Sequence, residues 1–528
     1  MTRKQSFLGG AFVLALAGLL SKVLGALYRI PLYPMLGQEG MGLFQMAYPA
    51  YGLILVLSTT GINVAVSKIV SERLAVGDRA GAWRAFRHAL ILLTGLGLVF
   101  SFLLFLAAEP IARFIAKDER AWLSIAAVSP AIFFVSVMAA YRGLFQGLQQ
   151  MTPTALSQVI EQLVRVATML ALASFLAPRG VKYASAGATF GAVTGAVAGL
   201  TYLLYVYCRN LPQLRQGMAG GTSTESAMTA LGRIMRIAIP VSMASGVLAM
   251  IQFLDLALVP TRLEAAGFVG REVTALFGQM SGGALPLINM PTVLTAALQV
   301  SLVPAISEGM ATGSLFTIRK RAETAVRVTF LIMLPAVVGL FVLADEIPAL
   351  LFRDPGIGVP LAAMSAGTLF LALQQTSSGV LQGMGQVGIP VRNLAIGAVA
   401  KGVATYYLTG LPALGIRGAA LGTVIGFLVA ASLNLTALSL LLGPIIKLKD
   451  MIIKPGLSAL IMGVGARLIY DHGHELVGTD LATVVAIAGG AGLFGLSILV
   501  LGGVRREDVE WLPVFGPSLG RLLGRGRR

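Results

Sequence analysis

Seven cationic side chains fall inside apolar segments of the sequence, where a charge needs a physical reason. A cation at the centre of a membrane-spanning helix costs about 2.5–3.5 kcal/mol on insertion scales, so such residues usually face a bundle interior and serve function. Glu161 and Asp255 are the clearest acidic residues in similar segments. The excess of positive charge predicts a cavity for an anionic ligand, and a pyrophosphate group is the obvious type. The cations are Lys22, Arg29, Arg142, Arg165, Arg392, Lys401 and Arg467.

Lys22 and Arg29 lie in the first apolar segment, and their spacing corresponds to two helical turns. Both side chains therefore share one helix face, about 10 Å apart along the axis. We expect both to face the cavity. For Arg29 an alternative is that the side chain extends toward the membrane surface from near a helix end.

A polar stripe runs along the segment around residue 161. Ser157, Glu161 and Arg165 recur at every fourth position and share one helix face, with Gln158 and Gln162 alongside. Two interpretations are open. Glu161 and Arg165 neutralise each other as an ion pair within the helix, or Arg165 contacts the substrate.

The remaining intramembrane polar residues complete the predicted site. Asp255 either binds a coupling cation or proton or pairs with Lys22 or Arg29, and we favour the pairing. Lys401, like Glu161, is expected to take part in coupling or intramembrane pairing. The predicted substrate-binding residues are Lys22, Arg29, Arg142, Arg165, Gln45 and Asn63.

Composition places the chain in a membrane. Of its 528 residues, 56% are hydrophobic and 12% charged, with a mean hydropathy of +0.83, whereas soluble proteins carry about 25% charged residues. The net charge of +17 is spread over short segments between apolar runs, which favours an anionic membrane surface over nucleic acid as its counterpart. The single cysteine, Cys208, excludes an intramolecular disulfide. The sequence contains no cysteine cluster and no Walker A motif, so we expect no metal, no cofactor and no enzyme activity.

Apolar runs long enough to cross a bilayer predict an all-α, polytopic membrane protein with about fourteen transmembrane helices. Outside these runs, 24 Lys and Arg residues lie on one side and nine on the other. The positive-inside rule therefore predicts that both termini are cytoplasmic. The predicted spans are 7–33, 41–66, 89–109, 123–147, 153–177, 184–207, 236–261, 275–304, 326–345, 358–384, 388–411, 418–442, 452–470 and 481–503.

The sequence contains an internal repeat. The segment from Gly143 to Pro153 resembles the segment from Gly379 to Pro390, at an offset of 236 that slips by one at the proline. Each copy contains six predicted helices, an even number, so the copies are parallel repeats that begin on the same side of the membrane. Two such lobes around a central cavity suit alternating access. The predicted lobes are 1–210 and 230–445, followed by two extra helices and a basic cytoplasmic tail in 446–528.

Two sets of residues resemble a known family. The first contains Leu27-Tyr28-Arg29-Ile30-Pro31-Leu32, the run from Leu36 to Gln45, and Ala47-Tyr48-Pro49; the second contains the runs from Arg142 to Gly147 and from Met151 to Val166. They resemble the stage V sporulation protein B group of polysaccharide biosynthesis proteins, within the multidrug/oligosaccharidyl-lipid/polysaccharide (MOP) exporter superfamily. This group includes, or is close to, the lipid II flippases.

The resemblance also implies roles for single residues. Ser21-Lys22-Val23-Leu24-Gly25 resembles the Ser-Arg-Val-Leu-Gly that opens those flippases, so their substrate-facing cation falls on Lys22. They carry an arginine on the second helix where this chain has Ala50-Tyr51-Gly52-Leu53, and an acid where it has Thr60.

The cations and the resemblance together predict a flippase of the bacterial cytoplasmic membrane. It would translocate an undecaprenyl-pyrophosphate-linked, lipid II-like precursor by alternating access, in peptidoglycan or spore-cortex synthesis. The expected partners are this anionic lipid-linked glycan, membrane lipid, a coupling cation or the membrane potential, and the cell-wall synthesis machinery, without nucleic acid. One alternative is a multidrug antiporter of the same superfamily. A less favoured one is a membrane-embedded glycan polymerase, which needs catalytic carboxylates in outer loops.

The cation bias gives a direct test of topology. Reporter fusions after residues 215, 315 and 520 should read cytoplasmic, and a fusion near residue 475 should read external, because the positive segments stay inside. An external reading at residue 315 would contradict the two-lobe arrangement.

Overall fold

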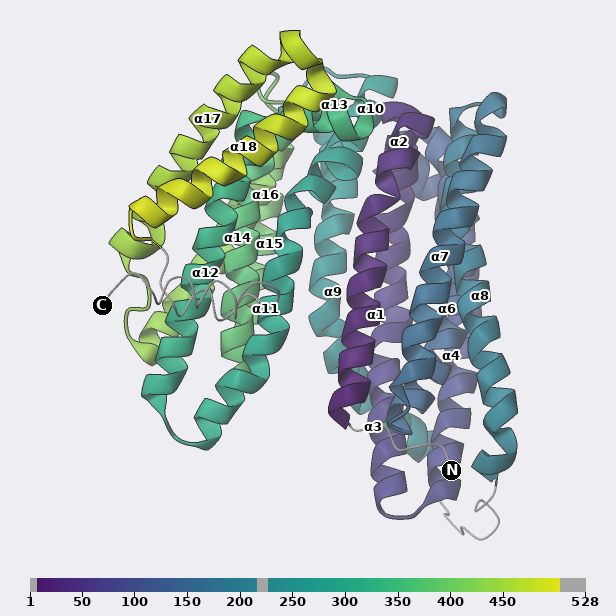
Figure 1. Cartoon of the computed structure of the whole chain (residues 1–528). Helices are drawn as coiled ribbons and strands as arrows, with labels where there is room; N and C mark the ends of the chain where they lie inside the picture. Colours follow the sequence, from purple (N-terminus) through teal and green to yellow (C-terminus); the bar gives the residue numbers. More distant parts are fainter. Residues whose placement is uncertain (1–6, 216–226, 504–528) are drawn as a thin grey trace. The chain divides into compact units, whose positions relative to one another are not determined.

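The computed structural model describes residues 7–215 and 227–503, and every regular element in these ranges is helical. The predicted all-α, polytopic fold is confirmed (Figure 1). Contacts divide the chain into two compact units. Unit 1 comprises the chain up to Glu264 together with Phe268–Gly278, and unit 2 comprises Ala265–Gly267 and the chain from Gln279 onward.

The helices of unit 1 are α1 (Phe7–Leu27), α2 (Arg29–Leu55), α3 (Gly61–Ala75), α4 (Arg79–Pro110), α5 (Trp122–Val128), α6 (Pro130–Gly147), α7 (Met151–Leu176), α8 (Val181–Arg215), α9 (Ala227–Ala265) and α10 (Arg271–Gly278). Those of unit 2 are α11 (Leu285–Ala311), α12 (Leu315–Val342), α13 (Glu346–Phe352), α14 (Gly358–Gly383), α15 (Gly388–Thr409), α16 (Ile416–Leu442), α17 (Lys454–Val477) and α18 (Thr479–Val500). Single π-helical turns lie at Val56–Thr60, Ile111–Ile115, Gln279–Ala284 and Lys449–Ile453, and 3-10 turns at Glu119–Ala121, Ala177–Arg179 and Pro355–Ile357.

Twelve helical segments of the described ranges are long and apolar enough to cross a membrane. Two predicted spans are not among them: α1 contains only a shorter apolar stretch, Leu16–Leu27, and α15 carries Arg392 and Lys401. The count of fourteen therefore stays a prediction. Several helices also extend beyond their apolar run. α4 begins at Arg79, before the predicted start at 89, because the Asp78 carboxylate caps it by accepting from the Gly81 N–H at 2.7 Å.

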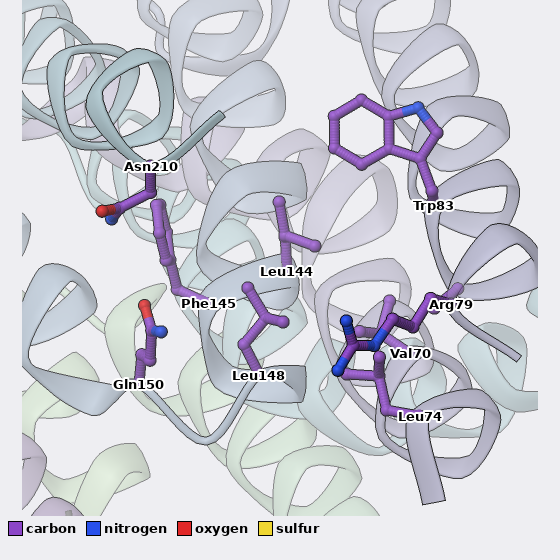
Figure 2. A pocket seen from close by; sticks show the side chains of 10 residues that line it. Val70, Leu74, Arg79, Trp83, Leu144, Phe145, Leu148, Gln150 and Asn210 are labelled. Atoms are coloured by element: carbon purple, nitrogen blue, oxygen red, sulfur yellow. The ribbon is translucent and has the colours of Figure 1, made fainter. Parts of the chain in front are cut away.

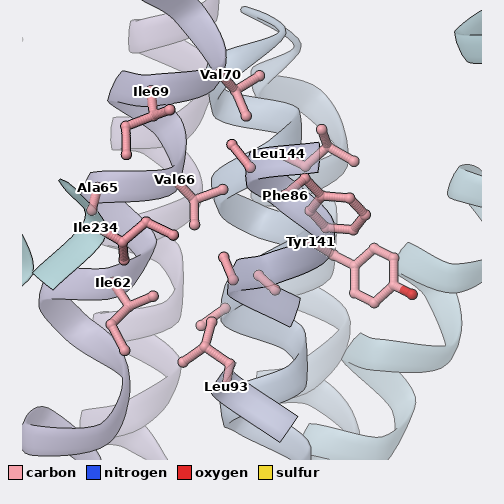
Figure 3. Packing of buried hydrophobic residues seen from close by; sticks show 14 of the residues in the cluster. Ile62, Ala65, Val66, Ile69, Val70, Phe86, Leu93, Tyr141, Leu144 and Ile234 are labelled. Atoms are coloured by element: carbon pink, nitrogen blue, oxygen red, sulfur yellow. The ribbon is translucent and has the colours of Figure 1, made fainter. Parts of the chain in front are cut away.

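The core of unit 1 lies between α3, α4 and α6 (Figure 3). Ile62 and Val66 of α3 pack with Leu93 of α4 and Tyr141 of α6 in one buried cluster. The helices approach closely because α6 has glycine at the contact. A Cβ on Gly143 would lie 2.9 Å from the Val66 Cβ, so a larger residue would push α3 away.

Corresponding residues of the two sequence copies have the same backbone geometry. Lys117 and Arg353 correspond at the offset of the repeat, and both adopt positive φ, of 61° and 58°. Gln149 and Gly385, at the same offset, also do so, at 57° and 80°. Three of these four are not glycine, and positive φ is uncommon for such residues. The repeat found in the sequence is thus also a repeat of turn conformation.

Helices α2 and α10 cross through a reciprocal pair of glycines. A Cβ on Gly42 of α2 would overlap the backbone carbonyl of Thr274, and a Cβ on Gly278 of α10 would overlap that of Gln38. Gly42 and Gly278 correspond at the offset of the repeat, and so do Gln38 and Thr274. The contact is therefore self-complementary, as at a two-fold interface.

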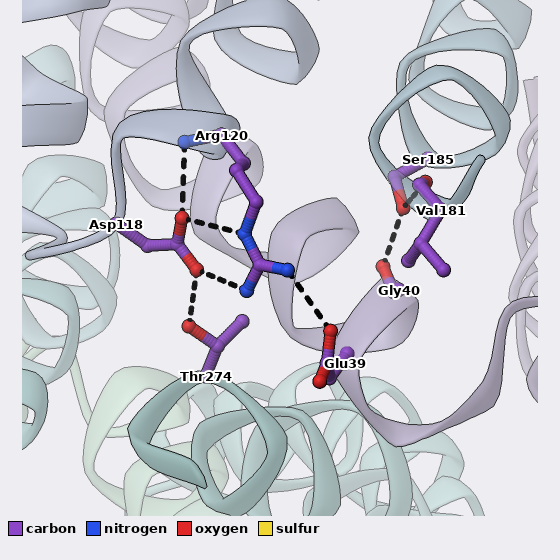
Figure 4. Close-up of polar contacts among 7 residues, drawn as sticks. All are labelled: Glu39, Gly40, Asp118, Arg120, Val181, Ser185 and Thr274. Atoms are coloured by element: carbon purple, nitrogen blue, oxygen red, sulfur yellow. Dashed lines mark hydrogen bonds and ion pairs between the residues drawn. The ribbon is translucent and has the colours of Figure 1, made fainter. Parts of the chain in front are cut away.

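A polar cluster holds the same end of α2 and α10 (Figure 4). Arg120 donates to both oxygens of Asp118, at 3.0 and 2.7 Å, and to Glu39 Oε2 of α2 at 2.9 Å. The Thr274 hydroxyl of α10 donates to Asp118 Oδ2 at 2.6 Å. Burial alone would raise the pKa of Asp118, but the hydrogen bonds from Arg120 and Thr274 outweigh it and lower that pKa. The carboxylate is thus the charged centre that joins three segments.

The glycine crossing predicts a packing effect at one position of α2. Gly42→Ala places a methyl group against backbone that cannot rotate away, and overpacking of this kind typically costs about 1–3 kcal/mol. We expect a lower melting temperature of the purified protein. Gly52→Ala, in the same helix with no atom within 4 Å of the new Cβ, is the matched control and should be neutral. Equal melting temperatures for the two variants would contradict the close crossing.

Candidate functional site

Two arginines of unit 1 share a single carboxylate. Glu161 of α7 accepts from Arg142 Nη2 of α6 at 2.9 Å through Oε2, and from Arg165 Nη2 at 2.5 Å through Oε1. The side chains are 14%, 14% and 19% exposed for Arg142, Glu161 and Arg165. We refer to these three residues as the charged triad. Because one negative charge faces two positive ones, the triad has a net charge of +1.

The polar stripe of α7 also fixes the orientation of Arg142. Arg142 Nε donates to the Ser157 hydroxyl at 3.0 Å, and Ser157 donates in turn to the Thr154 carbonyl at 2.7 Å. The guanidinium is thus held at Nε by Ser157 and at Nη2 by Glu161. Fixed, charge-assisted hydrogen bonds of this kind position an arginine before a ligand arrives.

Small residues on neighbouring helices let α7 place this stripe. On α8, a Cβ at Gly195 would come within 2.6 Å of the Glu161 carbonyl and 2.8 Å of the Arg165 Cβ, so the two backbones are in contact. On α1, a Cβ at Gly25 would lie 3.5 Å from Gln162 Nε2. Gly25 closes the Ser21–Gly25 motif, so that motif packs beside α7.

Tyrosines of the first two helices complete the site. The Arg165 charge acts on the hydroxyl groups of Tyr28, Tyr48 and Tyr51, and the Arg29 guanidinium lies 5.8 Å from the Tyr28 ring centroid. The Tyr48 and Tyr51 rings are 6.2 Å apart, edge to face. Phenol hydroxyls can donate to phosphate or sugar oxygens. The site therefore combines fixed positive charge with neutral donors.

The sequence analysis missed these tyrosines. Tyr28 and Tyr48 were available from the motifs that carry the family resemblance, and Tyr51 stands in the stretch where the lipid II flippases carry an arginine. The usable signal was their position beside Arg29 and Pro49, not their residue type, because a tyrosine within an apolar helix is usually packing.

The structure brings only part of the predicted set together. The Glu161–Arg165 ion pair is present, and Arg142 joins it, so the pair does not neutralise itself. Arg29 lies near the same tyrosines. Lys22 belongs to α1, but its side chain lies outside the described part of the structure.

The other predicted residues occupy separate places. Asn63 of α3 abuts α6, since its carbonyl lies 2.9 Å from a Cβ built on Gly143, the residue after Arg142. Gln45 is buried in α2, and Asp255 is half-buried in α9; its pairing with Lys22 or Arg29 stays a prediction.

Lys401 belongs to unit 2, where it is the repeat counterpart of Arg165 at the offset of 236. It is 6% exposed, and its Cβ lies 2.6 Å from a Cβ built on Gly426, much as Arg165 packs on Gly195. The structure therefore does not place Lys401 with the charged triad.

Polar atoms around the triad retain hydrogen-bonding capacity. Among the described residues, Arg165 Nε, Gln158 Oε1 and Asn63 Oδ1 are buried and have no hydrogen-bond partner. A buried polar group of this kind calls for an explanation, and a binding role is one. Within 7–215 and 227–503 there is no group of three or more His, Cys, Asp or Glu side chains that could hold a metal ion.

Comparison with known proteins agrees with this architecture. Residues 7–310 match the family described as polysaccharide biosynthesis proteins. The chain is 30% identical to stage V sporulation protein B of Bacillus subtilis (strain 168), over 97% of this chain and 99% of the relative. It is 27% identical to the lipid II flippase MurJ of the same organism, over 92% of this chain and 94% of the relative.

Solved structures give the same fold. A structure of the lipid II flippase MurJ in an inward closed conformation matches with a TM-score of 0.69 at 15% identity, over 94% of this chain and 99% of that one. An inward-facing multidrug resistance MATE family transporter of the MOP superfamily matches with a TM-score of 0.67 at 18% identity, over 79% and 94%. The resemblance seen in the motifs is confirmed: the chain is a multi-pass membrane protein with the fold of the MOP superfamily, and it belongs to the family of polysaccharide biosynthesis proteins.

Proposed function

We propose that the protein is a flippase that moves an undecaprenyl-pyrophosphate-linked, lipid II-like cell-wall precursor across the bacterial cytoplasmic membrane by alternating access. The observation that carries the proposal is the charged triad, a preorganised site of net charge +1 within apolar helices. Arginine forks match the geometry of phosphate oxygens. The names of two relatives, a sporulation protein and a lipid II flippase, support a role in peptidoglycan or spore-cortex synthesis.

The site binds the pyrophosphate group in this proposal. Arg142 and Arg165 keep their charge at every physiological pH, so the attraction does not depend on proton uptake. Tyr28, Tyr48 and Tyr51 lie where neutral donors can bind the remaining oxygens. The glycan and the polyprenyl tail need not be bound tightly, because the pyrophosphate is the part that lipid excludes most strongly.

A multidrug antiporter is the second candidate, because a MATE family transporter shares the fold. Organic cations are usually held by acidic or aromatic pockets, and a site of net positive charge repels them. Uptake of an organic cation against a proton or sodium gradient in vesicles would favour this alternative over the flippase.

The charged triad separates function from folding in one set of variants. Arg165→Gln leaves Glu161 paired with Arg142, so we expect normal membrane abundance. The net charge of the triad falls to zero, and we expect the transport rate to fall about tenfold or more, since a hydrogen bond to a charged group contributes about 1.5–3 kcal/mol. The measurement is translocation of a pyrophosphate-linked lipid disaccharide in proteoliposomes.

The controls for the triad use the same type of substitution. Glu161→Gln leaves two adjacent guanidinium groups without their carboxylate, so this variant should lose abundance. Arg392→Gln removes an exposed charge from α15 and should change neither abundance nor transport. Full transport by an abundant Arg165→Gln protein would confine the triad to a structural role.

The two cations of the first apolar segment give a further prediction. Lys22→Ala and Arg29→Ala should abolish growth rescue of a flippase-depleted strain at unchanged protein level, because each removes a charge near the pyrophosphate. Lys22→Arg should still rescue growth, since the charge is kept. Normal growth with both alanine variants would show that these residues do not bind phosphate.

A further inference from the structure

Unit 2 contains a second concentration of charge, on helices other than those of the charged triad. A cavity of about 380 Å³ lies between the start of α12 and the segment that leads into α17. We refer to it as the basic cavity. The charged residues that line it are Arg319, Lys320, Glu323, Arg327, Lys447 and Asp450. Four cations and two carboxylates give this lining a net charge of +2.

Both carboxylates of the basic cavity are already engaged by cations. Glu323 accepts from Arg319 Nε at 3.1 Å and from Lys447 Nζ at 2.6 Å. Asp450 pairs with Lys454 Nζ at 2.9 Å. The acids therefore position the cations but do not balance them, and the cavity keeps an excess of positive charge. This is the electrostatic condition for binding an anion.

Two arginines are held in place before any ligand binds. Arg327 is only 6% exposed although it lines the cavity, so its guanidinium belongs to the wall and is not a mobile surface group. Arg319 Nη2 donates to the Pro444 carbonyl at 3.0 Å, which fixes its fork against the segment after α16. Arginine forks with restricted motion lose little entropy on binding, and they match the geometry of phosphate better than lysines do.

Exposed apolar side chains border the basic cavity. Phe316, in its wall, is 78% exposed, and Leu448, next to Lys447, is 62% exposed. A bulky apolar rim around a cationic centre is typical of a membrane interface, where the rim contacts acyl chains and the cations contact head groups. The segments 308–327 and 447–454 are also those that the cation bias predicts to be cytoplasmic.

We propose that the basic cavity binds the phosphate group of an anionic membrane lipid of the cytoplasmic leaflet. Arg319 and Arg327 form the fixed part of the site, and Lys320 and Lys447 add charge at its mouth. The bound lipid would bridge α12 and the segment that leads into α17, so it would stabilise the attachment of the two last helices. This site is independent of the proposed transport of a pyrophosphate-linked substrate by unit 1.

The corresponding place in unit 1 has a different chemistry (Figure 2). Trp83 of α4 is the repeat counterpart of Arg319, and it lines a cavity of about 260 Å³ together with Leu74, Leu144 and Leu148. Its ring stacks on Tyr207 at 5.7 Å with 5° between the planes. The repeat therefore provides a cavity at this position in both copies, but only the copy in unit 2 lines it with ion-paired cations. The basic character is a property of that copy and not of the shared scaffold.

The test is native mass spectrometry of the delipidated full-length protein titrated with phosphatidylglycerol. We expect one tightly held lipid, and we expect the double variant Lys320→Gln and Lys447→Gln to bind it about tenfold more weakly or worse, as for loss of charge-assisted hydrogen bonds. Lys449→Gln is the matched control, because it removes the same charge from the same segment outside the cavity lining. It should bind as the unmodified protein does.

Two further arms keep the result decisive. Lys320→Gln alone leaves the Glu323 contacts intact, so a loss of lipid here cannot come from misfolding of the ion-paired wall. Inorganic phosphate in place of the lipid tests the soluble source of the same group. Phosphate binding without retention of phosphatidylglycerol would overturn the lipid as occupant, and equal lipid binding by the double variant and the control would overturn the site. Arg165→Gln should retain the lipid even where transport is lost, which separates this proposal from the transport function.

Discussion

Glu161 holds two guanidinium groups at once, and much of unit 1 is arranged around that contact. Inside apolar helices neither arginine could remain charged without a partner, so α6 and α7 must stay close enough for both bonds. Glycines make this possible on both sides. Gly195 lets α8 support α7 from behind, and Gly143 lets α3 support α6 one residue from Arg142. The close packing of small residues thus has an electrostatic purpose.

The two sequence copies keep the same scaffold and differ in what they display on it. In unit 2, Lys401 replaces Arg165, and Ser378 replaces Arg142 at the offset of 236. Asn434 fills the place of the charged network by donating to the Ser377 and Ser378 hydroxyls, both at 3.1 Å. A neutral network satisfies the same helices without a net charge. Charge for an anionic ligand is therefore concentrated in one copy, whereas the packing glycines are retained in both.

The sequence predicted the elements of this fold better than their contacts. Apolar runs and the internal repeat located the helices, because lipid exposure and duplication leave local, periodic signals. The ends were less accurate: α17 continues to Val477, past the predicted 470, since Arg467 and Asp471 pair within the helix at 3.0 Å and extend it beyond the apolar run. Periodicity also placed Glu161 and Arg165 on one face. It could not reveal that Arg142 shares Glu161, because that bond joins two helices and depends on their rotation about their own axes.

The shared carboxylate also bears on how a tightly charged substrate can leave. A cavity of uncompensated arginines would bind a pyrophosphate strongly and release it slowly, whereas transport needs binding that is favourable but reversible. Glu161 competes with the phosphate oxygens for the same guanidinium donors, since each arginine already uses one Nη2 on it. Entry of the substrate then exchanges one anion for another at fixed cations, and departure reverses the exchange without leaving a bare charge in the apolar interior. The acid is in this sense part of the anion site, because it holds the arginines ready and limits how strongly they bind.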